Sequence, residues 1–411
     1  MKVCVIGSGG REHALAWRLS ISPSVTKVYA IPGSAAMSDC AELVGIDWQQ
    51  SDHLIRFLKD NHVDLVVVGP EAPLVVGLAD ALNAAGVPVF GPSKAAAQLE
   101  GSKVFAKDLM KKYNIPTAAY GVFHKVDEAK EFIGQTGAPI VVKADGLAAG
   151  KGVVVAMTVE EANAAVEDML SGNRFGDAGS TVVIEEFMEG EEASLLAFVD
   201  GKTVVPMIAS QDHKRIYDGD KGPNTGGMGT YAPAPVLTDA LRDEAMKTIL
   251  EPMVGAMQKK GMPYVGCLYA GLMITPQGPK VVEFNARFGD PETQVVLPLL
   301  DSDLGQIMMA CATGTLTADM VKWKDSSAAC VILASKGYPE TSSKGDVIHG
   351  DIKQHDTTIV FHSGTKLIGD EYVTNGGRVL GVVGLGKDLR TALDRAYGRI
   401  EHIDFEGMQY R

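Results

Sequence analysis

The residues from Lys280 to Asn285 predict a β-strand that could bind a metal ion and phosphate. Side chains alternate between the two faces of a strand, so Glu283, Asn285 and Arg287 share one face. Mg²⁺ usually takes one or two protein oxygens and completes its octahedron with phosphate and water. We therefore expect Glu283 and Asn285 to bind Mg²⁺ that bridges nucleotide phosphates. The competing interpretation is a surface ladder of salt bridges.

A glycine-rich segment, KADGLAAGKG, starts at Lys143 and lies between two predicted strands. A P-loop has four residues between its glycines, then Lys and Ser or Thr leading into a helix. Here three residues separate Gly146 from Gly150, Gly152 follows Lys151, and a strand comes next. The segment therefore predicts a hairpin that folds over phosphates with a lysine at each side, and its alternative is an ordinary solvated hairpin.

Two further segments could contact ligands. The strand that begins at Val182 runs into acidic residues, and such a hinge could hold an adenine and the hydroxyls of a ribose; its candidates are Glu185, Glu186, Phe187, Met188 and Glu192. The segments SQDHKR, from Ser210, and GPNTGGMG, from Gly222, predict the edge of a substrate site in an irregular loop over 211–229. Solvated surface and ordinary turns are the alternatives. His213 has no partner pattern for catalysis, so we assign it no role.

The N-terminal turn GSGGREH predicts an anion site at the start of a helix. A dinucleotide fingerprint would need a third glycine where Glu12 stands and an acidic residue after the next strand, which instead ends at Ile31-Pro32. An NAD-binding protein is therefore disfavoured, and a small phosphate-bearing molecule fits better.

These segments must be positioned by several packed units, because 411 residues exceed one ordinary core. We expect a fold of α/β and α+β units: an N-terminal parallel α/β sheet over 1–101, a middle domain over 102–325 with a small lid subdomain over about 116–187, and a small β-rich C-terminal domain over 326–411. Within the first unit we expect a helix over 73–85. The second should contain an antiparallel sheet covered by a helix near 238–260.

Composition and charge exclude other classes of protein. A formal net charge of −13 disfavours attraction to nucleic acid or anionic lipid. No apolar run approaches the length of a membrane helix, and the N-terminus lacks the pattern of a signal peptide. The five cysteines include no CxxC pair, which is typical of reduced thiols. We therefore expect a cytoplasmic enzyme with no membrane partner.

Taken in order, these elements resemble the ATP-grasp superfamily, with Lys103 and Lys143 at the positions of its two phosphate-binding lysines. The finer resemblance is to the phosphoribosylamine–glycine ligase family and covers almost the whole chain. The motifs that carry it are GSGGREHA, GPEAPL, KADGLAAGKG, SQDHKR, GPNTGGMG, EFNARFGDPE, HSGTK and TNGGRV. One departure is that members of the family usually continue past the segment 405–411 with a short basic tail.

The resemblance implies ATP-dependent ligation of glycine to 5-phosphoribosylamine through glycyl phosphate, by a monomer. Lys103, Lys143 and Lys151 would neutralise phosphate charge, and Glu283 and Asn285 would hold Mg²⁺ or Mn²⁺. Arg287, aided by Asp212, would orient glycine. The remaining candidates for the substrates are Gly9, Gly10, Pro70, Glu71, Lys214, Gly289, Gly376, Gly377 and Arg378. Another ATP-grasp ligase, an NAD-dependent oxidoreductase and a non-catalytic nucleotide sensor are the alternatives.

Overall fold

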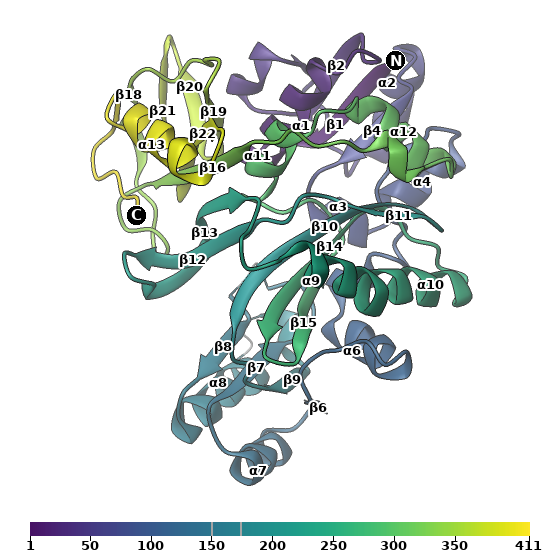
Figure 1. The fold of residues 1–411 in the computed structure, drawn as a ribbon, viewed down its shortest axis with the longest axis vertical. Helices are drawn as coiled ribbons and strands as arrows, with labels where there is room; N and C mark the ends of the chain where they lie inside the picture. The colour runs from purple at the N-terminus through teal and green to yellow at the C-terminus, as the bar shows by residue number, and fades with distance from the viewer. Residues whose placement is uncertain (149–150, 173–174) are drawn as a thin grey trace.

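The computed structural model describes residues 1–148, 151–172 and 175–411. Its N-terminal unit, in purple in Figure 1, is a parallel sheet with the order β3-β2-β1-β4-β5. The strands are β1 (Lys2–Gly7), β2 (Lys27–Pro32), β3 (Glu42–Leu43), β4 (Leu65–Val68) and β5 (Val89–Phe90). The predicted parallel α/β unit is confirmed.

Helices α1 (Gly10–Ser20), η1 (Ala35–Asp39), α2 (Ser51–Asp60), α3 (Glu71–Val75), α4 (Leu78–Ala84) and α5 (Gln98–Gly101) connect and follow these strands. The predicted single helix over 73–85 is wrong. Gly77 has a φ of 92°, which a helix cannot contain, and it separates α3 from α4. The pattern of apolar residues continues across this break, which is why it predicted one helix.

The next unit is a four-stranded antiparallel sheet, β6-β9-β7-β8, at the lower end of Figure 1. Its strands are β6 (Tyr120–Phe123), β7 (Ile140–Ala144), β8 (Val153–Ala156) and β9 (Val182–Glu186), and its helices are α7 (Val126–Thr136), α8 (Val159–Ser171) and η2 (Gly176–Gly179). It has a separate apolar core built from the sheet, α7 and α8. Helix α6 (Lys103–Lys112) precedes it, and the Ser102 side chain accepts from Phe105 N at its start.

The central sheet is antiparallel, with the order β11-β10-β14-β15, as the sequence predicts. Its strands are β10 (Glu191–Asp200), β11 (Val204–Pro206), β14 (Val265–Thr275) and β15 (Gly278–Asn285). The continuous helical run α9 (Asp239–Ala245), η3 (Met246–Leu250) and α10 (Glu251–Lys259) packs on it. After β15 come α11 (Thr293–Val296), η4 (Leu297–Leu299), α12 (Leu304–Thr313) and η5 (Ala318–Met320).

The prediction of an irregular loop over 211–229 is wrong. It forms a hairpin of β12 (Gln211–Tyr217) and β13 (Lys221–Ala232), and β13 pairs with the C-terminal strand β16 (Ser327–Ala334). The resulting sheet has the order β12-β13-β16-β22-β19. Glycine has a low intrinsic strand propensity, yet here the two arms of the hairpin pair with each other, and β16 pairs with the end of β13, from Gly229 to Ala232.

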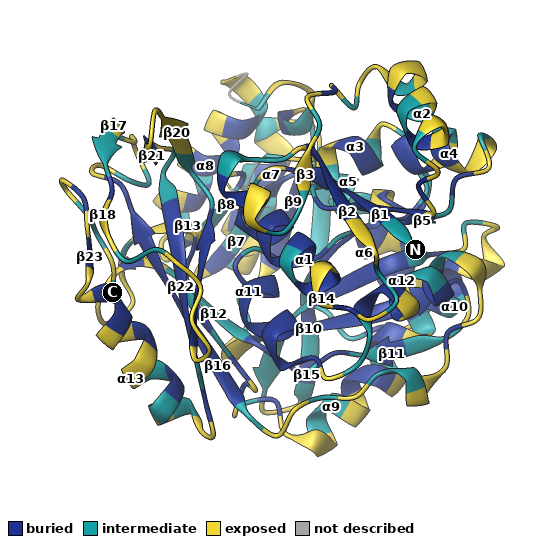
Figure 2. Cartoon of the chain, turned by 90° about the horizontal axis from the view of Figure 1, so that it is seen from above, coloured by how far each residue is buried: buried dark blue, intermediate teal, exposed yellow. Residues whose placement is uncertain are grey.

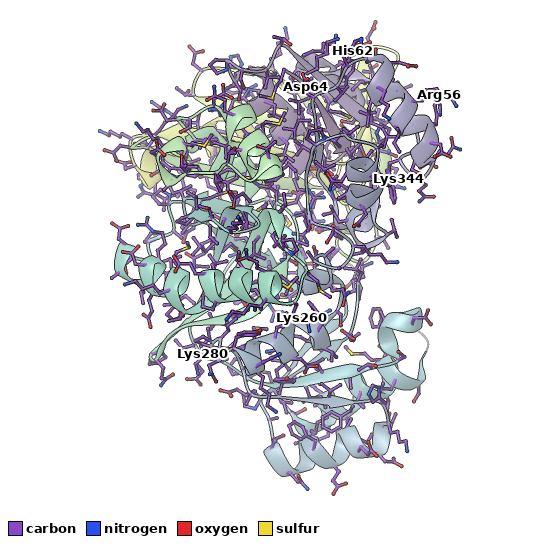
Figure 3. The ribbon with its side chains drawn as sticks, turned by 90° about the vertical axis from the view of Figure 1, so that its right-hand side faces the viewer. Arg56, His62, Asp64, Lys260, Lys280 and Lys344 are labelled. Atoms are coloured by element: carbon purple, nitrogen blue, oxygen red, sulfur yellow. The ribbon has the colours of Figure 1, made fainter. Side chains whose placement is uncertain are left out.

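The C-terminal unit, in yellow in Figure 1, completes that sheet with β19 (Thr358–His362) and β22 (Arg378–Gly386). Its other elements are β17 (Lys344–Val347), β18 (His349–Gly350), β20 (Thr365–Ile368), β21 (Glu371–Asn375), α13 (Leu389–Ile400) and β23 (Ile403–Asp404). Figure 2 shows the central strands as buried, whereas the exposed side chains of Arg56 and His62 lie at the outer edge of the molecule in Figure 3. Among the described residues, no helix is long and apolar enough to cross a membrane.

Candidate active site

Two buried lysines and one buried carboxylate join the β6-β9-β7-β8 sheet, named the lid sheet from here on, to helix α6. Lys143 Nζ, from β7, lies 2.6 Å from Glu185 Oε2 of β9, and Lys107 Nζ, from α6, lies 2.6 Å from Glu185 Oε1. Burial would raise the pKa of Glu185, but the charges of Lys143 and Lys107 outweigh it and lower the pKa. Glu185 therefore remains an anion that fixes both lysines.

Lys103 lies at the first position of α6, beside the turn that follows β7. Its Nζ donates to Gly146 O at 2.9 Å, and its backbone N donates to Asp145 Oδ1 at 2.7 Å. Burial lowers the pKa of Lys103, although Glu283 favours the charged form. Gly146 has a φ of 83°, which a side chain would disfavour. The glycine thus lets the turn approach Lys103.

The predicted glycine hairpin links β7 to β8. Lys151 is exposed, and Gly152 is buried with its carbonyl accepting from Ala144 N at 2.8 Å. A Cβ at Gly152 would lie 2.6 Å from Ala148 Cβ, so the two sides of the hairpin approach closely only with glycine there. Gly150 lies outside the described residues. Lys151 therefore extends into solvent, where a ligand could reach it.

Glu283 and Asn285 lie on one face of β15, opposite Gly271 and Tyr269 of β14. Burial would raise the pKa of Glu283, but Lys214, Lys143, Lys103 and Arg287 outweigh it, so the pKa is lowered. The carboxylate is therefore ionised. An anionic carboxylate and a neighbouring amide oxygen are hard donors that fit a divalent cation.

The hinge after β9 turns toward β10. Glu186 is exposed and its Oε2 accepts from Ala119 N at 3.1 Å, while Phe187 and Met188 are half-buried. Glu192 is exposed, and its Oε2 lies 3.6 Å from Lys214 Nζ. Half-buried apolar side chains next to exposed carboxylates match the chemistry expected for an adenine and its ribose.

Arg287 is held by two carboxylates from the N-terminal unit. Its Nη2 lies 2.8 Å from Glu100 Oε1, and its Nε lies 3.4 Å from Glu71 Oε2. Its Nη1 donates to Phe288 O at 3.3 Å. Glu71 begins α3, and Pro70 is the residue before it. A guanidinium has five N–H donors, so donors remain for a substrate carboxylate.

The N-terminal, middle and C-terminal units meet at the glycine turn before α1. A Cβ at Gly10 would overlap Ser363 Oγ and lie 3.0 Å from Gln294 Nε2, and one at Gly9 would lie 3.9 Å from Asp290 Oδ2. Arg378 Nη1 donates to Asp290 O at 3.0 Å and to Gly226 O at 2.9 Å. Gly376 and Gly377, in the turn before β22, approach Gly364 and Tyr338, respectively. Polar groups of all three units thus converge here.

Glu12 explains physically why a dinucleotide does not fit this turn. Its carboxylate is 2% exposed and ion-paired to Arg11 Nε at 3.0 Å. A Cβ at Gly7 or at Gly69 would overlap Glu12, so the carboxylate lies across the carboxyl ends of β1 and β4. This is where a pyrophosphate would bind. The Glu12 side chain fills the space beside Gly7 and Gly69 that the pyrophosphate would need.

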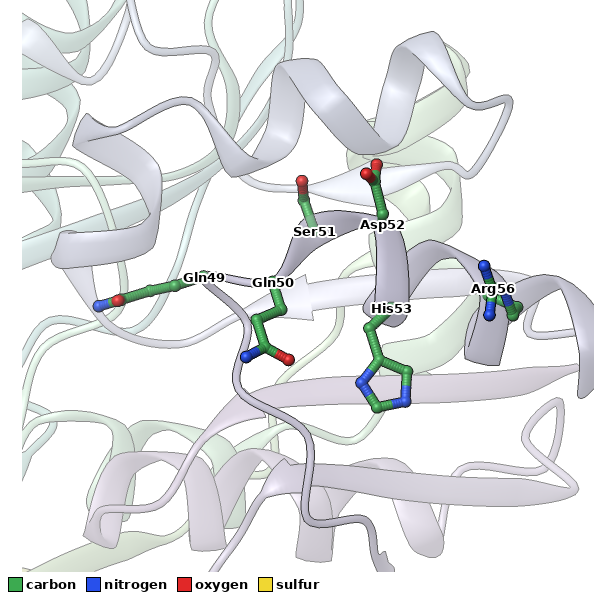
Figure 4. A pocket seen from close by; sticks show the side chains of 6 residues that line it. All are labelled: Gln49, Gln50, Ser51, Asp52, His53 and Arg56. Atoms are coloured by element: carbon green, nitrogen blue, oxygen red, sulfur yellow. The ribbon is translucent and has the colours of Figure 1, made fainter.

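One further group of potential ligands joins His13, Asp39 and Cys40. His13 Nδ1 accepts the backbone N–H of His362 at 3.0 Å, so the proton of the neutral ring is on Nε2, which faces Asp39 Oδ1 at 3.3 Å. A metal on Nε2 would require the imidazolate. The group is therefore better suited to link α1 and η1 with β19 than to bind metal. A shallow pocket of about 410 Å³ at the start of α2, shown in Figure 4, contains none of the predicted site residues.

Four residues that position this site have no role that the sequence predicts. Lys107 forms an ion pair with Glu185, and Glu100 forms one with Arg287. Tyr269 OH donates to Glu292 Oε1 at 3.2 Å. The only available signals were the spacing of Lys107, one helical turn after Lys103, and the presence of Glu292 in the motif EFNARFGDPE. The long-range pairings themselves have no local signature.

Comparisons with known proteins cover the whole chain. Family models of phosphoribosylglycinamide synthetase match it in three parts: the N domain at 1–100, the ATP-grasp (A) domain at 101–293 and the C domain at 328–411. A phosphoribosylamine–glycine ligase of Neisseria meningitidis serogroup A is 53% identical over 414 residues, covering 100% of this chain and 98% of that protein.

Several solved structures are similar over 100% of this chain, and two of them are described here. The phosphoribosylamine–glycine ligase of Thermotoga maritima has 34% identity, a TM-score of 0.87 and 99% of its own chain covered. The biotin carboxylase domain of 2-oxoglutarate carboxylase from Hydrogenobacter thermophilus, in complex with MgADP, ADP and bicarbonate, has 17% identity, a TM-score of 0.75 and 91% covered. At 17% identity, the similarity to the biotin carboxylase domain concerns the fold alone.

Proposed function

The chain belongs to the phosphoribosylglycinamide synthetase family, and from this premise we propose that it joins glycine to 5-phospho-D-ribosylamine with cleavage of ATP to ADP and phosphate. The product is N1-(5-phospho-D-ribosyl)glycinamide, an intermediate of de novo purine biosynthesis. The observation that carries the proposal is that Lys143 Nζ donates to Val282 O at 3.1 Å, beside Glu283 on β15, with Lys103 also acting on that carboxylate. It combines phosphate-binding cations with a metal-binding anion.

The first step is phosphoryl transfer. A carboxylate oxygen of glycine attacks the γ-phosphorus of ATP, and the bond to the bridging oxygen breaks to give glycyl phosphate and ADP. Lys103, Lys143 and Lys151 neutralise phosphate charge, and Arg287 orients glycine. The adenine and ribose lie at the hinge formed by Glu186, Phe187, Met188 and Glu192, and Glu185 holds the lysines. Glycine is already a nucleophile as its carboxylate, so the step needs no serine or cysteine.

The second step forms the amide. The amine of phosphoribosylamine attacks the carbonyl carbon of glycyl phosphate, the C–O bond to phosphate breaks, and the nitrogen loses a proton. Phosphoribosylamine binds where Gly9, Gly10, Asp290 and Arg378 converge. The hairpin between β7 and β8 closes over the site and excludes water, because glycyl phosphate would otherwise hydrolyse.

The cofactor is a divalent metal ion that binds together with ATP, and we propose Mg²⁺ or Mn²⁺. Glu283 and Asn285 would hold it, because both present oxygen donors on one face of β15. When bound, the ion neutralises charge on the β- and γ-phosphates. EDTA should abolish ADP release and either metal should restore it. Activity that survives EDTA would refute this assignment.

We also propose that the enzyme acts as a monomer in the cytoplasm. All five cysteines are free thiols, as expected in a reducing compartment. Light scattering at working concentration tests the monomer, and fractionation of cells tests the compartment. A mass of twice the 43.5 kDa chain or a secreted protein would overturn the respective proposal.

The experiment that tests the reaction is release of ADP from ATP and Mg²⁺ with glycine and freshly generated phosphoribosylamine, compared with omission of each. Release that requires both, with the amide as product, supports the proposal. Release without either substrate, or with bicarbonate or formate in place of glycine, would indicate another ATP-grasp ligase. Nicotinamide-dependent oxidation would indicate the oxidoreductase alternative.

A further inference from the structure

One face of helix α1 packs on the edge of the C-terminal sheet. Gly10, His13 and Trp17 are spaced by three and four residues, so they lie on one side of the helix. The rings of His13 and Trp17 both meet the ring of Phe361 edge-on, with 5.5 Å and 5.7 Å between ring centroids. Phe361 belongs to β19, which is an edge strand of its sheet. The helix therefore covers an edge that has no further strand within the described part of the chain.

His13 supplies a hydrogen-bond acceptor to this edge. Its Nδ1 accepts the backbone N–H of His362, the last residue of β19, at 3.0 Å. Both residues are buried, with His13 1% and His362 3% exposed. Loss of the acceptor would therefore leave a buried N–H without a partner, which is costly. The Nε2 of His13 faces Asp39 Oδ1 at 3.3 Å, and this second contact fixes the orientation of the ring.

The residues that follow β19, over 363–365, form a turn that contacts two predicted substrate residues; we name it the β19 turn. Gly364 N donates to Arg378 O at 2.9 Å. On the other side of the turn, Ser363 Oγ lies against Gly10, because a Cβ at Gly10 would overlap it. The β19 turn thus lies between the glycine turn before α1 and Arg378, which are two parts of the proposed site for phosphoribosylamine.

The β19 turn is packed closely against the segment that carries Arg378. A Cβ at Gly364 would lie 2.7 Å from Gly376 Cα, so the two turns approach each other closely only with glycine at this position. Across the turn, His362 Nδ1 lies 2.9 Å from Thr365 Oγ1. A displacement of His362 would therefore be passed on to the turn and to the backbone of Arg378.

We propose that His13 is a positioning residue for phosphoribosylamine: by accepting the His362 N–H, it holds the β19 turn between the two parts of the substrate site. His13 does not itself touch the substrate, and its effect passes through the backbone of His362. The residues proposed for ATP lie on α6, in the lid sheet and on β15, so their geometry does not depend on this contact. The inference rests on the proposed function, since it concerns the second substrate of that reaction.

The test removes the acceptor of His13 and then restores it. In His13→Leu the KM for phosphoribosylamine should rise about 5- to 50-fold, the loss expected for a buried N–H left without a partner. The KM for ATP and the KM for glycine should change less than about threefold. His13→Asn should bring the phosphoribosylamine KM back to within about threefold of the unmodified enzyme, because the Oδ1 of asparagine takes the place of Nδ1 as an acceptor.

Trp17→Leu is the matched control, because it loosens the packing on Phe361 without touching the hydrogen bond. It should lower the Tm as His13→Leu does and leave the phosphoribosylamine KM unchanged. A His13→Asn variant as impaired as His13→Leu, or equal changes in all three KM values, would overturn the inference. So would a rise of the phosphoribosylamine KM in Trp17→Leu equal to that in His13→Leu.

If His13→Leu does not fold, Asp39→Ala gives the comparison at an exposed position, because the ring of His13 then loses the partner of Nε2. The phosphoribosylamine KM should rise about 2- to 10-fold while the ATP KM stays unchanged, and an unchanged phosphoribosylamine KM would overturn the inference. The proposed function fails separately, when the unmodified enzyme forms no amide product from glycine and phosphoribosylamine.

Discussion

Lys143 and Glu185 form an ion pair across adjacent strands of the lid sheet, with 2.6 Å between Nζ and Oε2 and both side chains less than a tenth exposed. Lys107 completes the arrangement from α6, outside that sheet. One carboxylate thus connects the lid to the helix that starts with Lys103. Stability and nucleotide binding should both depend on it.

Glu185→Gln should lower the free energy of unfolding by about 3–5 kcal/mol, because it leaves two buried lysines without their anion. The KM for ATP should rise as Lys143 loses its fixed position. Urea unfolding and steady-state kinetics measure the two effects. Glu131→Gln, exposed on α7, is the control. A loss below about 1 kcal/mol, as at a surface pair, would contradict the role assigned to Glu185.

Glu283→Gln should reduce kcat/KM by more than about 100-fold, since loss of a direct metal ligand should exceed the effect of an outer partner. The variant should also need more Mg²⁺ for half-maximal activity, while its far-ultraviolet circular dichroism stays that of the folded protein. Titration of ADP release with Mg²⁺ measures this. An unchanged Mg²⁺ requirement would remove Glu283 from the metal site.

Acid should destabilise the protein through His362. Burial, and then the neighbouring His13, lower the pKa of His362 to about 3 from 6.5. Between these values the unfolded chain binds a proton that the folded chain does not, so stability falls as the pH drops below about 6.5. His362→Gln should remove up to about 1.4 kcal/mol per pH unit of this dependence.

Urea unfolding between pH 7 and 4.5 checks the prediction for His362, with the exposed His53→Gln as the control. The slope of stability against pH should become shallower in His362→Gln alone. Equal slopes in the two variants would show that other groups cause the acid sensitivity.

Substitution of alanine for glycine should change the stability of the protein in opposite directions at two positions. Gly227 has a φ of 123°, and a Cβ there would lie 2.5 Å from Pro291 Cδ, so Gly227→Ala should cost more than about 1 kcal/mol. Gly255, inside α10, has nothing within 4 Å of an added Cβ. Gly255→Ala should stabilise by about 0.5–1 kcal/mol. Thermal unfolding of both variants should give Tm shifts of opposite sign, and a shared sign would contradict the local geometry.

Local patterns predicted the parallel sheet, the central antiparallel sheet and the strand that carries Glu283, because apolar alternation and strand ends are encoded in short segments. They failed over 211–229, where glycine-rich residues of low strand propensity pair in a hairpin of β12 and β13. They also failed at Gly77, since one backbone angle ends a helix without changing the apolar pattern.

For the site, the sequence predicted that Lys103, Lys143 and Glu283 belong to one phosphate and metal site. The structure brings these charges within electrostatic reach of one another, and their chemical roles stay predictions. The sequence did not predict the residues that hold the side chains of the site in position. Glu100 comes to Arg287 from the N-terminal unit. Tyr269, on β14, donates to Glu292, in the segment that follows β15. Such contacts depend on how units pack together, which a single sequence read in short segments does not specify.

The pairing of β13 with β16 also determines the order of assembly during synthesis. β13 ends at Ala232, whereas β16 begins only at Ser327. At ribosomal rates this interval takes roughly 5 to 20 seconds, during which the outer edge of β13 has no strand to pair with. An unpaired edge can join another chain, so the nascent protein is most exposed to aggregation while its C-terminal strands are still inside the ribosome.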